Sequence, residues 1–195
     1  DIAVLYRTVA GLMGMAMEHF EPEFSLALCR AYNNWLYDYC ETDPARLKGV
    51  ALIPFRSVDL AIEETQRAVR ELGFLGVTLH PEPVDGKLIY DDEMDPLWSE
   101  FERLGTTVGL HGTSTAPSRE DISRKYLRHP AGRTLTHTIS FPTQMMASMA
   151  GLILSGTLER HPGVRVAFLE ANCSWLPWFL YRMDDQWEKY GDSPL

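Results

Sequence analysis

Two residues capable of metal or acid–base chemistry stand where strands are expected to end. The apolar stretch 106–111 closes with His111, and the apolar stretch 164–170 closes with Glu170. In α/β barrels the chemistry lies at the carboxyl ends of the parallel strands, where the loops build the site. An imidazole and a carboxylate in these positions predict an active-site rim, although one histidine and one glutamate can also end strands by chance.

Two further histidines are candidates, and each has a structural interpretation beside a functional one. His80 ends a short apolar run and precedes Pro81, so it could contact substrate on the same rim or pack under the proline-rich turn. His137 lies in the longest expected loop, before a helix that we expect to begin near Pro142, because proline suits a first helical turn. For both histidines the two interpretations stay open at the level of sequence.

The elements that must position these residues alternate regularly along the chain. Short apolar runs predict five strands, at 2–6, 50–55, 74–79, 106–111 and 164–170. Apolar residues at helical spacing predict helices at 23–39, 59–72, 95–104, 142–159 and 175–190. Continuous apolar strands are typical of a parallel sheet that helices cover. The fold class is therefore α/β with strands and helices in alternation.

Five strands do not close a barrel, which needs eight strands and typically about 250 residues. The alternative is an open doubly wound sheet, but neither of the glycine-rich phosphate-binding patterns, GxGxxG or GxxxxGK followed by Ser or Thr, occurs. We therefore predict an incomplete (β/α)8 TIM-barrel-like fold in a single partial domain over residues 1–195. The edge strands should expose unpaired backbone unless further chain or a partner copy covers them.

Composition excludes several classes of partner. The net charge is −9, from 18 Lys and Arg against 27 Asp and Glu, so we expect no nucleic acid and no anionic membrane surface as partners. Cys29, Cys40 and Cys173 lack CxxC spacing and are interpreted as reduced thiols. No apolar stretch is long enough to span a bilayer, and no signal peptide is recognisable. These features favour a cytoplasmic location.

Seven phrases follow one another in order along nearly the whole chain: AYNNWL (31–36), RLKGVA (46–51), ELGFLGV (71–77), DPLW (95–98), VGLH (108–111), SGTLERHP (155–162) and FLEANCSWLP (168–177). Together they resemble the amidohydrolase-related superfamily, in the branch that contains aminocarboxymuconate-semialdehyde decarboxylase and the resorcylate decarboxylases. The resemblance implies a distorted (β/α)8 barrel, of which this segment would supply about strands 2 to 6. It also implies one divalent metal, zinc first and manganese as the alternative.

The resemblance also implies roles for the four candidates. By position His111 looks like the metal ligand that ends strand 5, whereas the HxH pair of strand 1 and the aspartate of strand 8 are expected outside this segment. Glu170 stands near the family's strand-6 histidine, which favours partial burial and a role as acid or base over the alternative of capping the turn at 172–173. His137 falls where family members place substrate-facing residues, and we expect it to be catalytic. His80 is expected to bind substrate.

The activity implied is that of a metal-dependent hydrolase or a non-oxidative decarboxylase that acts on a small carboxylated substrate, including an aromatic one. Zinc can lower the pKa of a bound water to about 7, which serves hydrolysis, and an acid beside the metal can protonate carbon as CO2 leaves. We expect a small-molecule substrate and a homo-oligomer. The alternatives are a catalytically inactive or structural barrel fragment, or an unrelated α/β protein that binds a small molecule.

Overall fold

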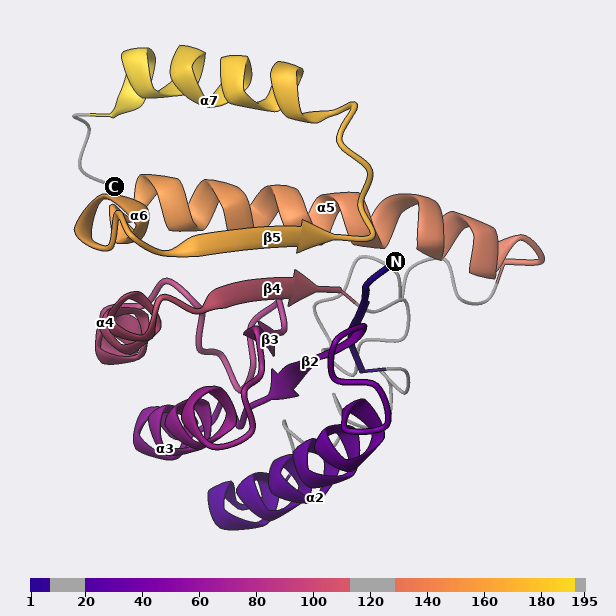
Figure 1. Ribbon diagram of the computed structural model, residues 1–195. Coiled ribbons are helices and arrows are strands. Elements are labelled where there is room, and N and C mark those ends of the chain that lie inside the picture. Colours follow the sequence, from indigo (N-terminus) through magenta and orange to yellow (C-terminus); the bar gives the residue numbers. More distant parts are fainter. Residues whose placement is uncertain (8–19, 113–128, 192–195) are drawn as a thin grey trace.

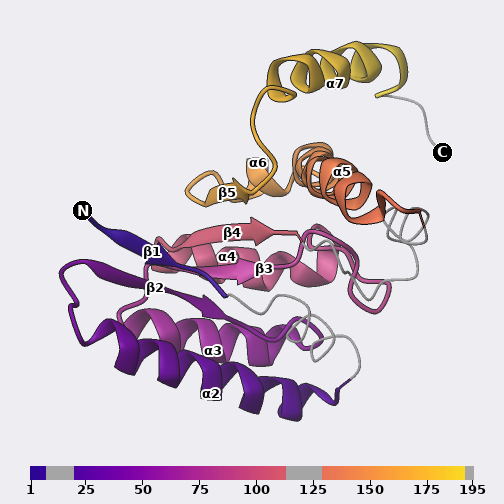
Figure 2. The ribbon, with the colours of Figure 1, turned by 90° about the vertical axis from the view of Figure 1, so that its right-hand side faces the viewer.

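The computed structural model describes residues 1–7, 20–112 and 129–191. Within these ranges five parallel strands form one curved sheet, each paired with the next in sequence (Figures 1 and 2). The strands are β1 (Ala3–Leu5), β2 (Leu47–Leu52), β3 (Gly76–Leu79), β4 (Thr107–His111) and β5 (Arg165–Leu169). The helices are α2 (Pro22–Cys40), α3 (Val58–Arg70), α4 (Asp95–Leu104), α5 (Gly132–Leu154), α6 (Thr157–Arg160) and α7 (Leu176–Tyr190), with a 3-10 turn η1 (Asp92–Met94).

The strand order separates the two architectures that the sequence left as alternatives. Every connection advances by one strand in the same direction, giving the order β1-β2-β3-β4-β5. A barrel has this order, whereas a doubly wound sheet reverses its order at a switch point. The predicted incomplete barrel is confirmed, and the sheet is open. β1 and β5 form its two edges, and Ile2 and Val4 on the β1 edge are exposed, as predicted.

The main hydrophobic core lies between the sheet and the helices that cover it. Leu97, Trp98 and Phe101 of α4 are fully buried together with Val108 and Leu110 of β4. The Trp98 ring packs edge-on against Phe101, and its Nε1–H donates to the carbonyl of Ile89 at 2.6 Å, so the indole is buried with its polar atom satisfied. No helix in the described ranges is long and apolar enough to cross a membrane.

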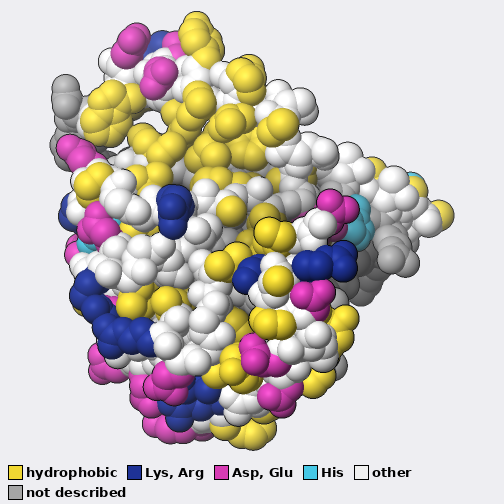
Figure 3. Space-filling view, in the orientation of Figure 1, with side chains coloured by type: hydrophobic (Ala, Val, Ile, Leu, Met, Phe, Trp, Pro, Cys, Tyr) yellow, Lys and Arg dark blue, Asp and Glu magenta, His cyan; other side chains and the backbone are white. Residues whose placement is uncertain are grey.

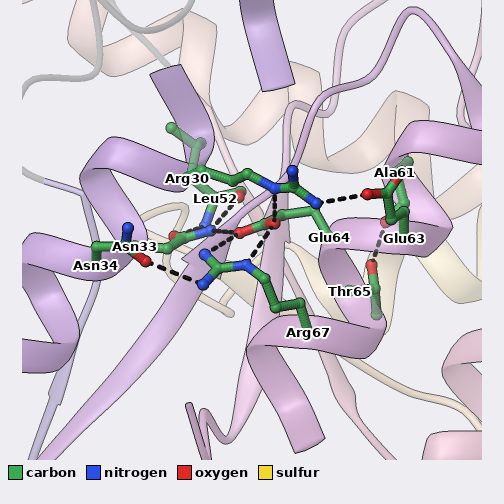
Figure 4. Close-up of polar contacts among 9 residues, drawn as sticks. All are labelled: Arg30, Asn33, Asn34, Leu52, Ala61, Glu63, Glu64, Thr65 and Arg67. Carbon is green, nitrogen blue, oxygen red and sulfur yellow. Dashed lines mark hydrogen bonds and ion pairs between the residues drawn. The ribbon is translucent and has the colours of Figure 1, made fainter. Parts of the chain in front are cut away.

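A charged network fastens α2 to α3 and to β2 (Figure 4). The carboxylate of Glu64 is fully buried and accepts hydrogen bonds from Arg30, from Arg67 and from the Asn33 amide. Asn33 in turn pairs with both backbone groups of Leu52 at the end of β2, at 2.8 and 2.9 Å. A buried charge is tolerated only when it is paired and hydrogen-bonded. Glu64 meets this condition, and the network sets the position of β2's carboxyl end.

The expected boundaries of two elements are wrong. The strand expected at 50–55 begins earlier, at Leu47, and ends at Leu52. The helix expected at 142–159 begins ten residues earlier, at Gly132, so Pro142 lies inside α5. It ends at Leu154, and residues 157–160 form the separate helix α6. Proline inside a helix costs about 3 kcal/mol. Here buried residues on both sides of the proline, Phe141 before it and Met145 and Leu152 after it, hold the helix against the sheet. Packing thus overrides the local preference.

The far side of α5 is less completely covered. A groove of about 380 Å³ runs between α5 and α7, lined by Ala150, Leu154, Phe179, Arg182, Met183, Gln186, Trp187, Tyr190 and Gly191. Hydrophobic side chains gather around this part of the surface in Figure 3. No described residue of α7 is buried.

Candidate active site

His111 is the last residue of β4, at the carboxyl edge of the sheet, as the sequence predicted. Its Nδ1 lies 2.8 Å from the carbonyl oxygen of Gly112. A carbonyl only accepts hydrogen bonds, so Nδ1 carries the hydrogen and Nε2 of the neutral ring keeps its lone pair. Metal-binding histidines commonly show this arrangement, in which the second nitrogen donates to a carbonyl and fixes the ring. The side chain therefore fits a metal ligand through Nε2.

The carboxylate of Glu170 lies opposite that nitrogen, with Oε2 3.1 Å from Nε2 of His111. Glu170 follows β5 directly and has a φ of +59°, the left-handed region that residues other than glycine rarely adopt. Asn172, with a φ of +55°, shares this conformation. A lone pair and a carboxylate at this distance repel each other unless a proton or a cation lies between them. The pair can therefore hold a proton or contribute two ligands to one metal.

The expected partial burial of Glu170 is wrong for the part of the chain that the structure describes. Its side chain is 54% exposed. After the left-handed turn the chain leaves the sheet at the end of β5 and continues to α7 (Figure 1). Glu170 is thus open to solvent beside a more enclosed His111. A carboxylate in that position can exchange protons with water.

His80 follows β3 and is buried on the same edge of the sheet, 6% exposed. Its Nδ1 accepts a hydrogen bond of 3.2 Å from the backbone N–H of Glu82, so it does pack against the proline-containing turn. Its Nε2, by contrast, is buried with no hydrogen-bond partner. Burial first, and then the positive charge of Arg7, lower the pKa of His80 to about 3, with His111 also contributing. The ring is therefore neutral near pH 7.

His137 lies on α5 and not in a loop, which corrects the expectation from sequence. Its ring stacks on Phe141, with centroids 5.0 Å apart, and Phe141 meets the His111 ring edge-on at 6.3 Å. Phe141 thus lies between the two histidines and links α5 to the end of β4. His137 itself is exposed. A catalytic role for it stays a prediction.

Sequence reasoning missed Arg7 and Tyr6, which come from the end of β1. Arg7 donates from Nη2 to the carbonyl of His111 at 3.2 Å, although the two residues are 104 positions apart. The Tyr6 ring lies over Gly109 of β4, where an added Cβ would come within 2.8 Å of its Cε1. Both residues stand just past a strand end. The rule that singled out His111 would have found them too.

Among the described residues, no group of three or more His, Cys, Asp or Glu side chains gathers closely enough to hold a metal ion. His111 and Glu170 therefore form at most part of a metal site. The chemistry of the two donors, an imidazole nitrogen and a carboxylate oxygen, suits zinc or manganese. The remaining ligands are expected from other chain, as the resemblance implied.

Comparison with known proteins agrees with this geometry. The amidohydrolase family model matches residues 7–195. A gamma-resorcylate decarboxylase of Rhodococcus jostii is 33% identical over 172 residues, which cover 84% of this chain and 50% of that protein. The crystal structure of 2,6-dihydroxybenzoate decarboxylase from Rhizobium is similar over 100% of this chain and 58% of its own, with a TM-score of 0.77 and 22% identity.

A second solved structure with the same fold contains manganese. The dihydroxybenzoic acid decarboxylase of a Polaromonas species, crystallised with manganese and the inhibitor 2-nitroresorcinol, has a TM-score of 0.64 and 23% identity over 77% of this chain and 46% of its own. These likenesses establish the barrel fold, and this chain spans about half the length of the curated relatives it matches. With the family model matched along nearly the whole sequence, the chain belongs to the amidohydrolase family.

Proposed function

We propose that the full-length protein is a metal-dependent, non-oxidative decarboxylase of a small aromatic carboxylate. The observation that carries this proposal is the pairing of His111 with Glu170 at the carboxyl edge of a half-barrel. The pairing offers a site for a cation and a site for a proton within 3.1 Å of each other. The decarboxylases named above, from Rhodococcus and Rhizobium, support the choice of this reaction over hydrolysis.

The reaction replaces a carboxylate by a hydrogen on the same carbon. The bond between the ring carbon and the carboxyl carbon breaks, its electron pair stays on the ring carbon, CO2 leaves, and the ring carbon takes one proton. Glu170 in its protonated form is the proposed donor of that proton. Because its side chain is 54% exposed, it can be reprotonated by solvent after each turnover. General acid catalysis of this kind contributes about 100-fold or more to a rate.

His111 is the proposed metal ligand, through Nε2. When bound, a divalent metal would supply positive charge that orients the carboxylated substrate and stabilises negative charge during the reaction. Zinc and manganese are both proposed as the ion, and metal analysis of the purified protein distinguishes them. The contact between Nδ1 and Gly112 holds the His111 ring ready for either ion.

His80 is proposed to bind substrate through its unpartnered Nε2. His137, whose ring stacks on Phe141, is proposed as a second proton-transfer group. We also predict a homo-oligomer, which light scattering on the full-length protein measures directly.

The central test is turnover of 2,6-dihydroxybenzoate by the metal-loaded, full-length protein, followed as release of resorcinol and CO2. Glu170→Gln nearly preserves the shape of the side chain and removes its titrating proton. We expect it to lower kcat by about 100-fold and to remove one limb of the pH profile. Near-normal turnover with an unchanged pH profile would show that Glu170 is not the acid.

His111→Ala separates the metal role from the proton role. We expect loss of bound metal, measured by elemental analysis, together with loss of activity. Full metal occupancy in this variant would overturn the ligand assignment. A wild-type protein that binds metal and neither decarboxylates aromatic acids nor hydrolyses esters or amides would support the alternative of an inactive barrel.

A further inference from the structure

Arg7 is a buried cation, and among the described residues no carboxylate lies close enough to match its charge. Its side chain lies just past the end of β1 and the residue is 5% exposed. One nitrogen donates to the His111 carbonyl, and the Nε–H is buried without a hydrogen-bond partner. In the described part of the chain no carboxylate comes within the 4.0 Å that defines an ion pair with it. Buried guanidinium groups are ordinarily paired with carboxylate or phosphate.

Among the described residues, the ionisable groups that act on the charge of Arg7 are Tyr32 and Cys29 of α2. They do not compensate that charge. Burial raises the pKa of the Cys29 thiol to about 12 and raises that of Tyr32 above its usual value, so both are neutral near pH 7. Burial in turn lowers the pKa of Arg7. An unpaired buried cation is costly, and an anionic ligand would offset the cost.

His80 presents a second donor in the same neighbourhood. Its Nδ1 accepts from the Glu82 N–H, so in the neutral ring the hydrogen lies on Nε2. That N–H is buried with no partner. Arg7 and His80 are close enough for the charge of Arg7 to disfavour protonation of His80. Two orphaned donors, one charged and one neutral, therefore lie together at the carboxyl edge of the sheet.

The surroundings of these donors suit a flat aromatic acid. Thr78, whose buried Oγ1 also lacks a partner, is the register neighbour of Gly109. The ring of Tyr6 covers Gly109, and His111 lies two residues further along β4 on the same face. An aromatic ring, a hydroxyl and two N–H donors are thus contributed by residues at or near the carboxyl ends of the strands that flank His111. A carboxylate, which only accepts hydrogen bonds, complements the unpartnered N–H groups of Arg7 and His80.

We propose that Arg7 and His80 bind the carboxylate of the substrate, Arg7 as its charge partner and His80 as a neutral hydrogen-bond donor. The proposal rests on the proposed function, since it deepens the assignment of that same site. A carboxylate has about four lone-pair positions, so it can accept from both side chains and still face a metal held by His111. Because the product has lost the carboxylate, the same two residues discriminate substrate from product and favour product release.

The test compares two ligands that differ only in the carboxylate. For the metal-loaded, full-length protein, KM is measured for 2,6-dihydroxybenzoate and the inhibition constant is measured for resorcinol. We expect Arg7→Gln to raise KM about 10- to 100-fold, the loss expected for a charge-assisted hydrogen bond. The inhibition constant for resorcinol should change by no more than about twofold, which is the size of change that an ordinary surface substitution produces. Arg7→Lys keeps the positive charge but lacks the planar guanidinium with its several N–H donors. Its KM for 2,6-dihydroxybenzoate should lie between those of the wild type and Arg7→Gln.

His80 variants test the neutral donor. His80→Gln can place an amide N–H near the position of Nε2, and His80→Leu cannot. We expect the glutamine variant to recover most of the affinity for the carboxylate that the leucine variant loses. Arg46→Gln is the matched control, because Arg46 is an exposed arginine at the opposite end of the sheet, where its Nε donates to Asp1. It should leave both constants unchanged.

Equal weakening of both ligands by Arg7→Gln, or no weakening of either, overturns the proposal and leaves a decarboxylase function intact. If the wild type does not turn over the acid, calorimetry measures both dissociation constants directly. Selective loss of acid binding in Arg7→Gln would then uphold the carboxylate site while the proposed reaction fails. Circular dichroism shows whether Arg7→Gln folds. If it does not fold, the affinities of Arg7→Lys, His80→Gln and His80→Leu for the acid decide whether these residues bind the carboxylate.

Discussion

The two sides of the half-barrel are covered very differently. All four residues of β3 are buried, and α2, α3 and α4 pack over the sheet in that half. In β5 the first residue is exposed and the other four are only partly buried, and α7 has no buried residue. The candidate site lies where the coverage changes. The donors Arg7 and His80 are buried, whereas Glu170 is exposed and comes from the open side, directly after β5.

The difference in coverage favours different roles for the two sides, with substrate binding on the covered side and proton exchange on the open side. Hydrogen bonds and charges act most strongly where water is excluded, so the covered side is suited to bind and orient. Proton exchange needs access to water, and the open side supplies it. If this contrast in coverage holds in the full-length protein, matched substitutions on the two sides should differ in their effect on stability, and groups of the site should differ in their access to water.

The largest difference in the free energy of unfolding is expected between substitutions of two tryptophans. Trp98 of α4 is 1% exposed and Trp178 of α7 is 59% exposed. We expect Trp98→Ala to lower the free energy of unfolding by about 3–5 kcal/mol, through lost burial and a cavity. Trp178→Ala should cost about 0.5 kcal/mol or less. Denaturant unfolding of the full-length protein measures both. Equal losses would mean that a further layer covers α7 and that the contrast does not exist in the whole protein.

The charged network offers a test on the covered side alone. Glu64→Ala removes the anion that Arg30, Arg67 and Asn33 share, and we expect a loss of about 3–5 kcal/mol in unfolding free energy, as for other broken buried ion pairs. Glu63→Ala is the control one residue away. Its carboxylate is exposed and pairs only at the surface, so the change should stay near zero. Similar losses of stability in the two variants would show that the buried network does not hold β2 in place.

The burial of His80 predicts a pH dependence of stability. Its pKa lies near 6.5 in the unfolded chain and about 3 in the folded protein. Below pH 6.5 the unfolded state therefore binds a proton that the folded state excludes, and stability falls as the pH is lowered towards 3. The loss approaches about 1.4 kcal/mol per pH unit, or about 2 kcal/mol at pH 5.

The measurement is the difference in unfolding free energy between the wild type and His80→Gln at pH 7 and at pH 5. We expect the variant to lose less stability than the wild type over this interval. Exposed His129, changed in the same way to glutamine, provides the control. Parallel losses in all three proteins would show that His80 titrates normally and is not enclosed.

The smallest perturbation is chemical labelling of the thiols, which leaves the fold unchanged. Cys173 is exposed beside Glu170, and Cys29 is buried with its pKa raised to about 12. At pH 8 we expect iodoacetamide to label Cys173 at least about 100-fold faster than Cys29, because the thiolate is the reacting form. Mass spectrometry of the native protein identifies the labelled residue. Protection of Cys173 in the full-length protein would place additional chain over the open side.

Much of the architecture follows from local sequence. Apolar runs and helical periodicity located all five strands and most of the helix boundaries, because these patterns depend on neighbours within a few residues. That His111 and Glu170 share one edge follows from parallel strands, whose carboxyl ends must lie together. Gly105 marks the end of α4 with a φ of +63°, a C-terminal signal that the sequence carries on its own.

Tertiary contacts alone decided the rest. Pro142 is a poor helix-interior residue, and only the burial of its neighbours against the sheet keeps it inside α5 and places His137 on a helix. The contact of Arg7 with His111 spans 104 positions, and no local pattern encodes a pairing of that separation. The same holds for the open edge at Glu170. Sequence periodicity determines which face of an element is apolar, whereas the exposure of a particular side chain depends on whether distant chain packs over it.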